Sequence, residues 1–167
     1  INRINACRMH GIKTLVFHPA RGYSPPKPSE FGLNNIKKLV DVAQRQNVNI
    51  ALENTGRPEY IDYIISNIDS DRIKLCYDTG HEHCFAKTDM LQKYPERLIS
   101  LHLSDNDGLS DRNQEITRKS RLYNILKNYN LKNKTINFNF QKTLVFKKTS
   151  ITIRSTQLER AWPCTRV

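Results

Sequence analysis

The sequence predicts an α/β fold with a parallel sheet, and two repeating patterns support this prediction. Short, mostly apolar runs recur through the first two thirds of the chain, as is typical of strands buried on both faces. Segments with the helical spacing of apolar residues lie between these runs. A chain of 167 residues has room for about one domain.

The predicted elements alternate along the chain. The strands are residues 14–18, 49–53, 73–78 and 98–103, and the helices are residues 3–10, 34–46, 58–65 and a segment that starts at 88. Gly11 is placed to close the first helix. The second helix carries apolar residues at i, i+3, i+4 and i+7. Pro58 suits the first turn of the third helix, and Thr88 is a candidate N-cap for the last.

A polar side chain ends each predicted strand: His18, Glu53, Asp78 and His102. In a (β/α)8 barrel, functional side chains lie where the strands end, at the C-terminal face. We therefore predict a partial (β/α)8 TIM barrel with about four central β/α units. A doubly wound open sheet is the alternative fold, but the sequence contains neither of the glycine-rich motifs that mark nucleotide sites in such sheets.

Three of these strand ends predict a metal site. If the strands are parallel neighbours, Glu53, Asp78 and His102 converge on one ion, with His18 and His81 nearby. Carboxylate and imidazole ligands suit Mn, Mg, Zn or Co rather than a metal that prefers thiolates. Such an ion polarises a carbonyl or phosphoryl oxygen, or activates a bound water.

Two residues beside the predicted ligands are candidates for binding a substrate. Gly80 permits a tight turn after Asp78, so that His81 faces the same pocket. Asn54 follows Glu53 directly, where its amide is placed to hold a substrate hydroxyl. A contact between the Asn54 side chain and a loop is the alternative.

The basic charge lies in the last third of the chain. The net charge is +11, and residues 1–111 contain 14 basic and 14 acidic residues, so residues 112–167 account for all of it. We predict a barrel segment at 1–111 and a Lys/Asn-rich tail at 112–167 that is not part of the barrel. Two origins of the tail remain open: an accessory region that binds phosphate backbones, and a segment from a shifted reading frame or an unspliced stretch.

Other sequence features predict a cytoplasmic protein. The N-terminus has no secretory signal, and no apolar run is long enough to span a membrane. The four cysteines show no paired spacing, so we expect reduced thiols. The chain starts without Met, so we expect a fragment or a processed product.

Four motifs together resemble the xylose-isomerase-like TIM-barrel superfamily, which contains sugar-phosphate isomerases and epimerases and endonuclease IV-type enzymes. They are Phe17-His18-Pro19, Leu52-Glu53-Asn54-Thr55, the segment from Tyr77 to His81, and the segment from Leu101 to Gly108. The resemblance covers residues 3–111.

The resemblance implies a metal-dependent enzyme that isomerises or epimerises a small-molecule sugar or sugar phosphate. Glu53, Asp78 and His102 match divalent-metal ligands, and Glu53 also matches an acid/base that moves a proton next to a carbonyl. The metal would stabilise the enediolate oxygens. His18 and His81 match residues that contact the substrate.

Two alternatives follow from departures from the family pattern. A zinc-dependent endonuclease acting at abasic sites would bind nucleic acid, but residues 1–111 carry no net charge and the family's Asp-x-His is here Asp111-Arg112-Asn113. The other alternative is an inactive barrel fragment, because the first two strands and the closing Glu ligand have no counterpart. We expect the chain to hold strands three to six of the barrel.

Overall fold

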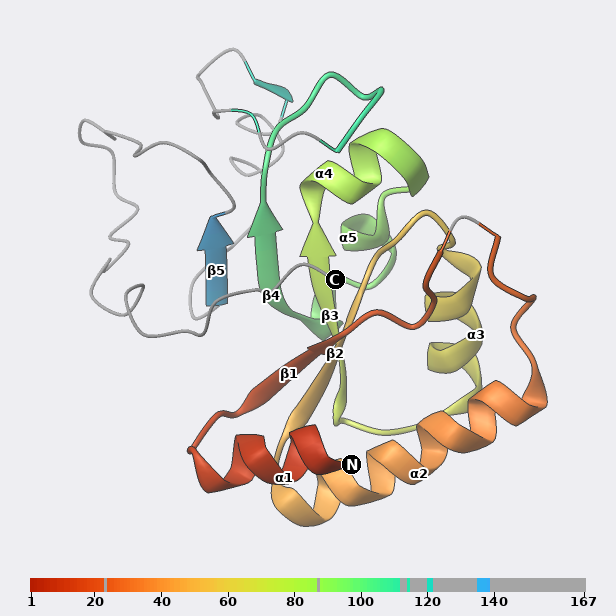
Figure 1. The fold of residues 1–167 in the computed structure, drawn as a ribbon, viewed down its shortest axis with the longest axis vertical. Helices are drawn as coiled ribbons and strands as arrows, with labels where there is room; N and C mark the ends of the chain where they lie inside the picture. Colours follow the sequence, from red (N-terminus) through yellow and green to blue (C-terminus); the bar gives the residue numbers. More distant parts are fainter. Residues whose placement is uncertain (23, 87, 112–113, 115–119, 122–134, 139–167) are drawn as a thin grey trace.

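The computed structural model describes residues 1–22, 24–86, 88–111, 114, 120–121 and 135–138. Its centre is one parallel sheet in the order β1-β2-β3-β4-β5 (Figure 1). The strands are β1 (Thr14–Phe17), β2 (Asn49–Glu53), β3 (Ile73–Asp78), β4 (Leu98–Leu103) and β5 (Thr135–Phe138). Because neighbours in the sheet follow the chain order and are parallel, the first four strands with their helices form a half-barrel.

Helices connect the successive strands. They are α1 (Asn2–Met9), α2 (Glu30–Gln46), α3 (Glu59–Asn67), α4 (Thr79–His81), the π-helix η1 (Glu82–Ala86), α5 (Met90–Lys93) and the 3-10 turn η2 (Pro95–Arg97). Gly11 adopts a positive φ of 69° just after α1, as a helix-ending glycine does. The Ser29 hydroxyl accepts a hydrogen bond from the Gly32 backbone N–H and caps α2.

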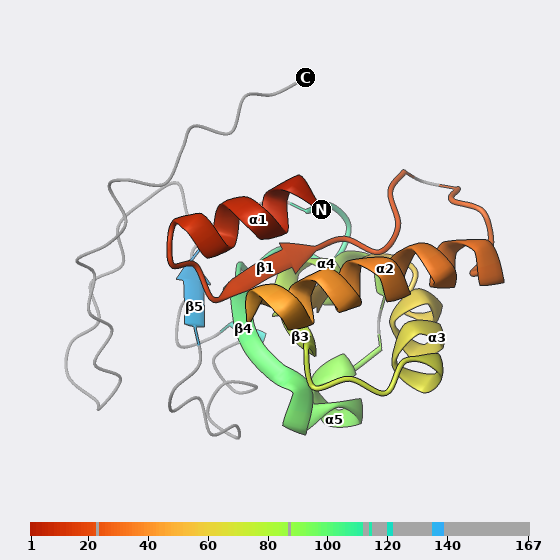
Figure 2. The ribbon, with the colours of Figure 1, turned by 90° about the horizontal axis from the view of Figure 1, so that it is seen from below.

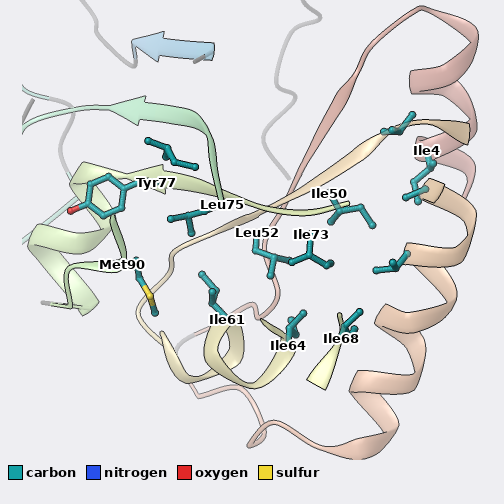
Figure 3. Close-up of a cluster of buried hydrophobic side chains, with 14 of the residues drawn as sticks. Ile4, Ile50, Leu52, Ile61, Ile64, Ile68, Ile73, Leu75, Tyr77 and Met90 are labelled. Carbon is teal, nitrogen blue, oxygen red and sulfur yellow. The ribbon is translucent and has the colours of Figure 1, made fainter. Parts of the chain in front are cut away.

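The hydrophobic core fills the space between one face of the sheet and the helices α2 and α3 (Figure 3). Helices α1 and α2 lie next to one another below β1 in Figure 1, and Figure 2, seen from below, shows β1 between them. Ile50 and Leu52 of β2 and Leu75 of β3 point into this core and are buried. Strand side chains alternate between faces, so Glu53 and Cys76 point to the opposite face, the inside of the half-barrel.

A one-residue irregularity in β4 sets which side chains reach that inner face. Leu75 pairs with Leu98, but the next residue, Cys76, pairs with Ser100, which leaves Ile99 as an extra residue in β4. The shift brings His102 opposite Asp78. Without it, every β4 side chain beyond this point would change face.

The structure confirms the predicted half-barrel. Residues 49–53, 73–78 and 98–103 form β2, β3 and β4 with the predicted bounds, and β1 ends one residue earlier than expected. Helix α2 begins at Glu30, before the predicted start at 34, and α5 is capped by Asp89 rather than by Thr88. Strand β5 was not predicted. Among the described residues, no helix has both the length and the apolar character needed to cross a bilayer.

Three of the four cysteines lie within the described residues. Cys7, Cys76 and Cys84 are free thiols. Cys164 lies outside the described part of the chain.

Candidate active site at the ends of the strands

Glu53, the last residue of β2, lies at the centre of the site. Its side chain is only 5% exposed. His18 donates from Nε2 to Glu53 Oε2 at 2.7 Å, and His102 donates from Nδ1 to Glu53 Oε1 at 3.1 Å. His81 Nδ1 lies 3.5 Å from the same Oε1. One buried carboxylate therefore joins imidazoles that come from the ends of β1 and β4 and from α4.

These contacts fix the charge on Glu53. Burial alone raises the pKa of Glu53, but hydrogen bonds from His102 and His18 outweigh burial and lower the pKa to about 2. The hydrogen bond to Glu53 also raises the pKa of His18. Glu53 is therefore an anion at neutral pH.

His102 gains a proton through the same contacts. Burial lowers the pKa of His102, whereas hydrogen bonds to Cys76 and Glu53 raise it, to about 10. Burial also raises the pKa of the Cys76 thiol, so Cys76 is uncharged at neutral pH. At that pH it is therefore the contact with Glu53 that raises the pKa of His102. The inner face thus holds a buried carboxylate paired with an imidazolium.

Asp78 ends β3 and begins the helix that follows. Its Oδ1 accepts a hydrogen bond from the His81 backbone N–H at 2.8 Å and caps α4. Its Oδ2 lies 3.7 Å from His102 Nδ1. Burial raises the pKa of Asp78, and the electrostatic interaction with the neighbouring His81 opposes that rise. His102 therefore stands between the carboxylates of Asp78 and Glu53.

The Asn54 side chain holds Asp78 in place. The Asn54 amide nitrogen donates to the Asp78 backbone carbonyl at 2.8 Å, and the Asp78 N–H donates to Asn54 Oδ1 at 2.6 Å. Asn54 is fully buried. Both polar ends of its side chain bond the backbone at the end of β3, a contact across two strands rather than the local loop contact that the sequence left open as the alternative. A substrate-binding role for Asn54 stays a prediction.

Residues 78–81 form a helical turn rather than the expected tight turn, and Gly80 serves a purpose that the sequence did not reveal. The backbone of Gly80 does not need the positive φ that favours glycine. A Cβ added at this position, however, would lie 2.3 Å from the Ser104 hydroxyl oxygen. Asn106, buried in the loop after β4, donates from Nδ2 to the Gly80 carbonyl at 3.1 Å. Gly80 therefore allows the β4 loop to pack directly against α4.

Among the residues that the structure describes, two groups of side chains have ligand atoms close enough together to hold a metal ion. In each of them, the three ligand atoms lie within 4.8 Å of one another: His18, Glu53 and His81 in one, and Glu53, Cys76 and His102 in the other. The buried anionic carboxylate and the imidazoles fit a divalent ion. Asp78 belongs to neither group, although it lies beside His102. Cys76 was missed as a candidate ligand, because it reads as one more apolar residue inside a strand.

Comparison with known proteins shows to which family the chain belongs. The sequence profile of the xylose isomerase-like TIM barrel family matches residues 1–133. The chain belongs to this family. The match to the xylose isomerase-like family continues past residue 111, where the composition changes, and the predicted division into 1–111 and 112–167 stays a prediction.

Several known proteins resemble the chain over part of their length. An uncharacterized protein of Methanocaldococcus jannaschii is 25% identical over 123 residues, which cover 62% of this chain and 41% of that protein. A crystal structure of a D-tagatose 3-epimerase-like protein matches with a TM-score of 0.65 and 20% identity, over 83% of this chain and 60% of that one. An IolI protein with a bound zinc atom matches with a TM-score of 0.62 and 18% identity, over 82% and 57%.

These likenesses establish the fold. The chain spans less than two thirds of the length of each of these proteins. The half-barrel is therefore the part of the xylose isomerase-like fold that this chain shares with them.

Proposed function

We propose that this chain carries half of the active site of a metal-dependent isomerase or epimerase whose substrate is a small sugar or sugar phosphate. The observation that carries the proposal is the buried Glu53 carboxylate, held between His18 and His102 at the C-terminal ends of the strands. Active sites of (β/α)8 enzymes lie at this face. The D-tagatose 3-epimerase-like protein and the zinc-containing IolI protein support the choice of chemistry.

Glu53 is the proposed proton carrier. Its carboxylate takes a proton from the carbon next to the substrate carbonyl and returns it. With a pKa of about 2 it is a weak base as long as both histidines bond it. A substrate hydroxyl that accepts the hydrogen bond of His18 in place of Glu53 removes one of the contacts that lower the pKa of Glu53. The pKa of Glu53 then rises toward the range in which proton transfer is efficient.

His18 and His81 are proposed to bind the substrate. The His18 side chain is 40% exposed and ends at the Glu53 carboxylate, so a ligand can reach both groups together. His81 donates from Nδ1 to the Asn54 carbonyl at 3.0 Å, which leaves Nε2 for other partners, and Nε2 lies 3.5 Å from Asp111 Oδ2. The fixed Nδ1 contact sets the orientation of the His81 ring.

A divalent ion would be held by Glu53, Asp78 and His102, as the sequence predicts. When bound, it would polarise the substrate carbonyl and stabilise the enediolate oxygens. The candidate ions are Mn, Mg, Co and Zn.

The proposal is tested on the full 167-residue chain. The protein is supplied with Mn²⁺ or Zn²⁺ and incubated with ketohexoses and their phosphates in D2O, and NMR follows deuterium uptake at the carbon next to the carbonyl. We expect uptake by the wild type and by the control Glu96→Gln, whose side chain is 67% exposed. Glu53→Gln is expected to abolish it.

A parallel assay uses DNA with an abasic site. Cleavage of that DNA without deuterium uptake by any sugar would overturn the proposal in favour of a nuclease. Uptake that persists in Glu53→Gln would remove Glu53 from the role of proton carrier.

A further inference from the structure

Phe85 lies at the rim that carries the proposed active site, yet the proposed mechanism does not use it. It belongs to η1, which follows α4 at the end of β3 (Figure 1). Phe85 is 48% exposed. Single exposed apolar residues are common on protein surfaces, so exposure alone gives this ring no role. The neighbours of the ring distinguish Phe85 from such residues.

Three rings contact one another in sequence beside the buried Glu53 carboxylate. His18 donates to Glu53, and the ring centroids of His18 and His81 are 5.9 Å apart in an edge-to-face arrangement. The centroid of Phe85 lies 6.0 Å from that of His81, with the two ring planes tilted by 42°. Aromatic rings attract one another at centroid separations of about 4.5–7 Å. Phe85 therefore extends the wall formed by the two histidines that are proposed to bind the substrate.

The loop after β2 fixes the base of Phe85. A Cβ added to Gly56 would lie 3.2 Å from the Phe85 Cβ, so the backbone of Gly56 packs against Phe85 with little room for a side chain. The carbonyl of Asn54, in the same loop, accepts the hydrogen bond from His81 Nδ1. One loop thus positions both the His81 ring and Phe85. The turn that carries Phe85 is a π-helix, a wide turn that is frequent at functional sites.

A sugar presents two kinds of surface to a protein, its hydroxyl groups and its patches of C–H bonds. Glu53, His18 and His81 can exchange hydrogen bonds with hydroxyls. The C–H patches are apolar, and their hydrogens are attracted to the negative face of an aromatic ring. Binding sites for small molecules combine apolar and aromatic walls with a few polar groups in this way. A half-exposed phenyl ring beside the polar groups is suited to the apolar part of a sugar.

We propose that Phe85 is a substrate-binding residue whose ring receives the C–H face of a hexose while the hydroxyls of that hexose bond His18 and His81. The inference rests on the proposed function for the position of the sugar. Phe85 carries no group that transfers a proton, so it contributes to affinity and leaves the chemical step to Glu53. Removal of the ring therefore raises KM and leaves kcat unchanged.

The test uses the full 167-residue chain with Zn²⁺ and four probes: D-tagatose, D-fructose and their 6-phosphates. Saturation-transfer NMR titrations measure Kd, and deuterium uptake from D2O measures KM and kcat. Phe85→Leu removes the ring and keeps an apolar side chain. We expect it to raise Kd and KM about three- to tenfold, the range of a single aromatic contact, with kcat unchanged.

Two further variants separate the aromatic ring from other effects of the substitution. Phe85→Trp keeps an aromatic face and is expected to bind the probes with a Kd close to that of the wild type. Phe31→Leu makes the same change as Phe85→Leu at another exposed ring, in the first turn of α2, where Phe31 is 80% exposed. We expect this control to leave Kd, KM and kcat unchanged.

The outcomes distinguish this inference from the proposed function. Unchanged Kd and KM in Phe85→Leu would overturn the role of Phe85 and leave the proposed function standing, and so would a fall in kcat with unchanged KM. Sugar binding that weakens in Phe85→Leu, without deuterium uptake by the wild type, would support the role of Phe85 and contradict the proposed chemistry. If the wild type binds none of the four probes, both proposals fail.

Discussion

Replacing Glu53 by Gln is expected to destabilise the metal-free protein in a way that depends on pH. The pKa of Glu53 is about 2 in the folded chain, against an ordinary value of 4.5. Because the folded pKa is the lower one, the stabilisation is complete above pH 4.5 and is lost as the pH falls toward 2. The side chain is 5% exposed, so solvent screens the interaction little.

The size of the effect follows from the shift. A difference of about 2.5 pKa units corresponds to about 3 kcal/mol at pH 7. At pH 3 about 1.4 kcal/mol of it remains, because the unfolded chain binds the proton at this pH while the folded protein largely does not. We therefore expect Glu53→Gln to lower the free energy of unfolding by about 3 kcal/mol at pH 7, and by about 2 kcal/mol less than that at pH 3.

Urea unfolding followed by circular dichroism, with EDTA present, measures both values. Glu96→Gln makes the same chemical change at an exposed position and is expected to alter stability by less than about 0.5 kcal/mol at either pH. A gap between wild type and Glu53→Gln that is equally large at pH 7 and pH 3 would refute the reasoning. In that case the loss would come from packing rather than from charge.

Three other substitutions or titrations test separate parts of the structure. Gly80→Ala places a Cβ against the Ser104 hydroxyl and should cost about 1–3 kcal/mol in thermal unfolding, whereas Gly32→Ala, with 3.6 Å of room, should not destabilise the protein. Burial and a hydrogen bond to a carboxylate raise the pKa of Tyr94 to about 12, so wild-type stability should fall as the pH rises from 10 toward 12, and Tyr94→Phe should lack this alkaline loss. The ion of the proposed function would displace the proton that the raised pKa of His102 keeps on its ring, so calorimetric affinity for Zn²⁺ should rise with pH between 7 and 9, by up to about tenfold per pH unit for this proton. Affinity independent of pH would contradict this.

The sequence carried enough information to predict the strands that hold the site. The strands β2, β3 and β4 are buried on both faces, so their residues read as unbroken apolar runs with polar ends. Since parallel strands present their C-terminal ends at one edge, Glu53, Asp78 and His102 could be expected to lie together. The contacts among His18, Glu53 and His102 agree with that expectation.

The detail inside the site depends on contacts between distant segments, which a single sequence does not reveal. Gly80 was assigned to a turn because glycine favours turns, but its role is to leave room for the Ser104 side chain from the loop after β4. Cys76 was overlooked because a buried cysteine and a buried valine give the same apolar pattern. Only the spacing of two residues between Cys76 and Asp78 pointed to a shared face.

The extra residue in β4 has a consequence for how such sites arise and disappear among homologues. Ile99 is not one of the predicted site residues, yet the register shift at Ile99 decides whether the imidazole of His102 faces the side of the sheet that carries Glu53 and Asp78 or the opposite side. Loss of a single codon there would keep every motif and the sheet, but the His102 side chain would no longer lie on the same face of the sheet as Glu53 and Asp78. Motif searches alone would count such a homologue as active, so strand length has to be inspected alongside the motifs.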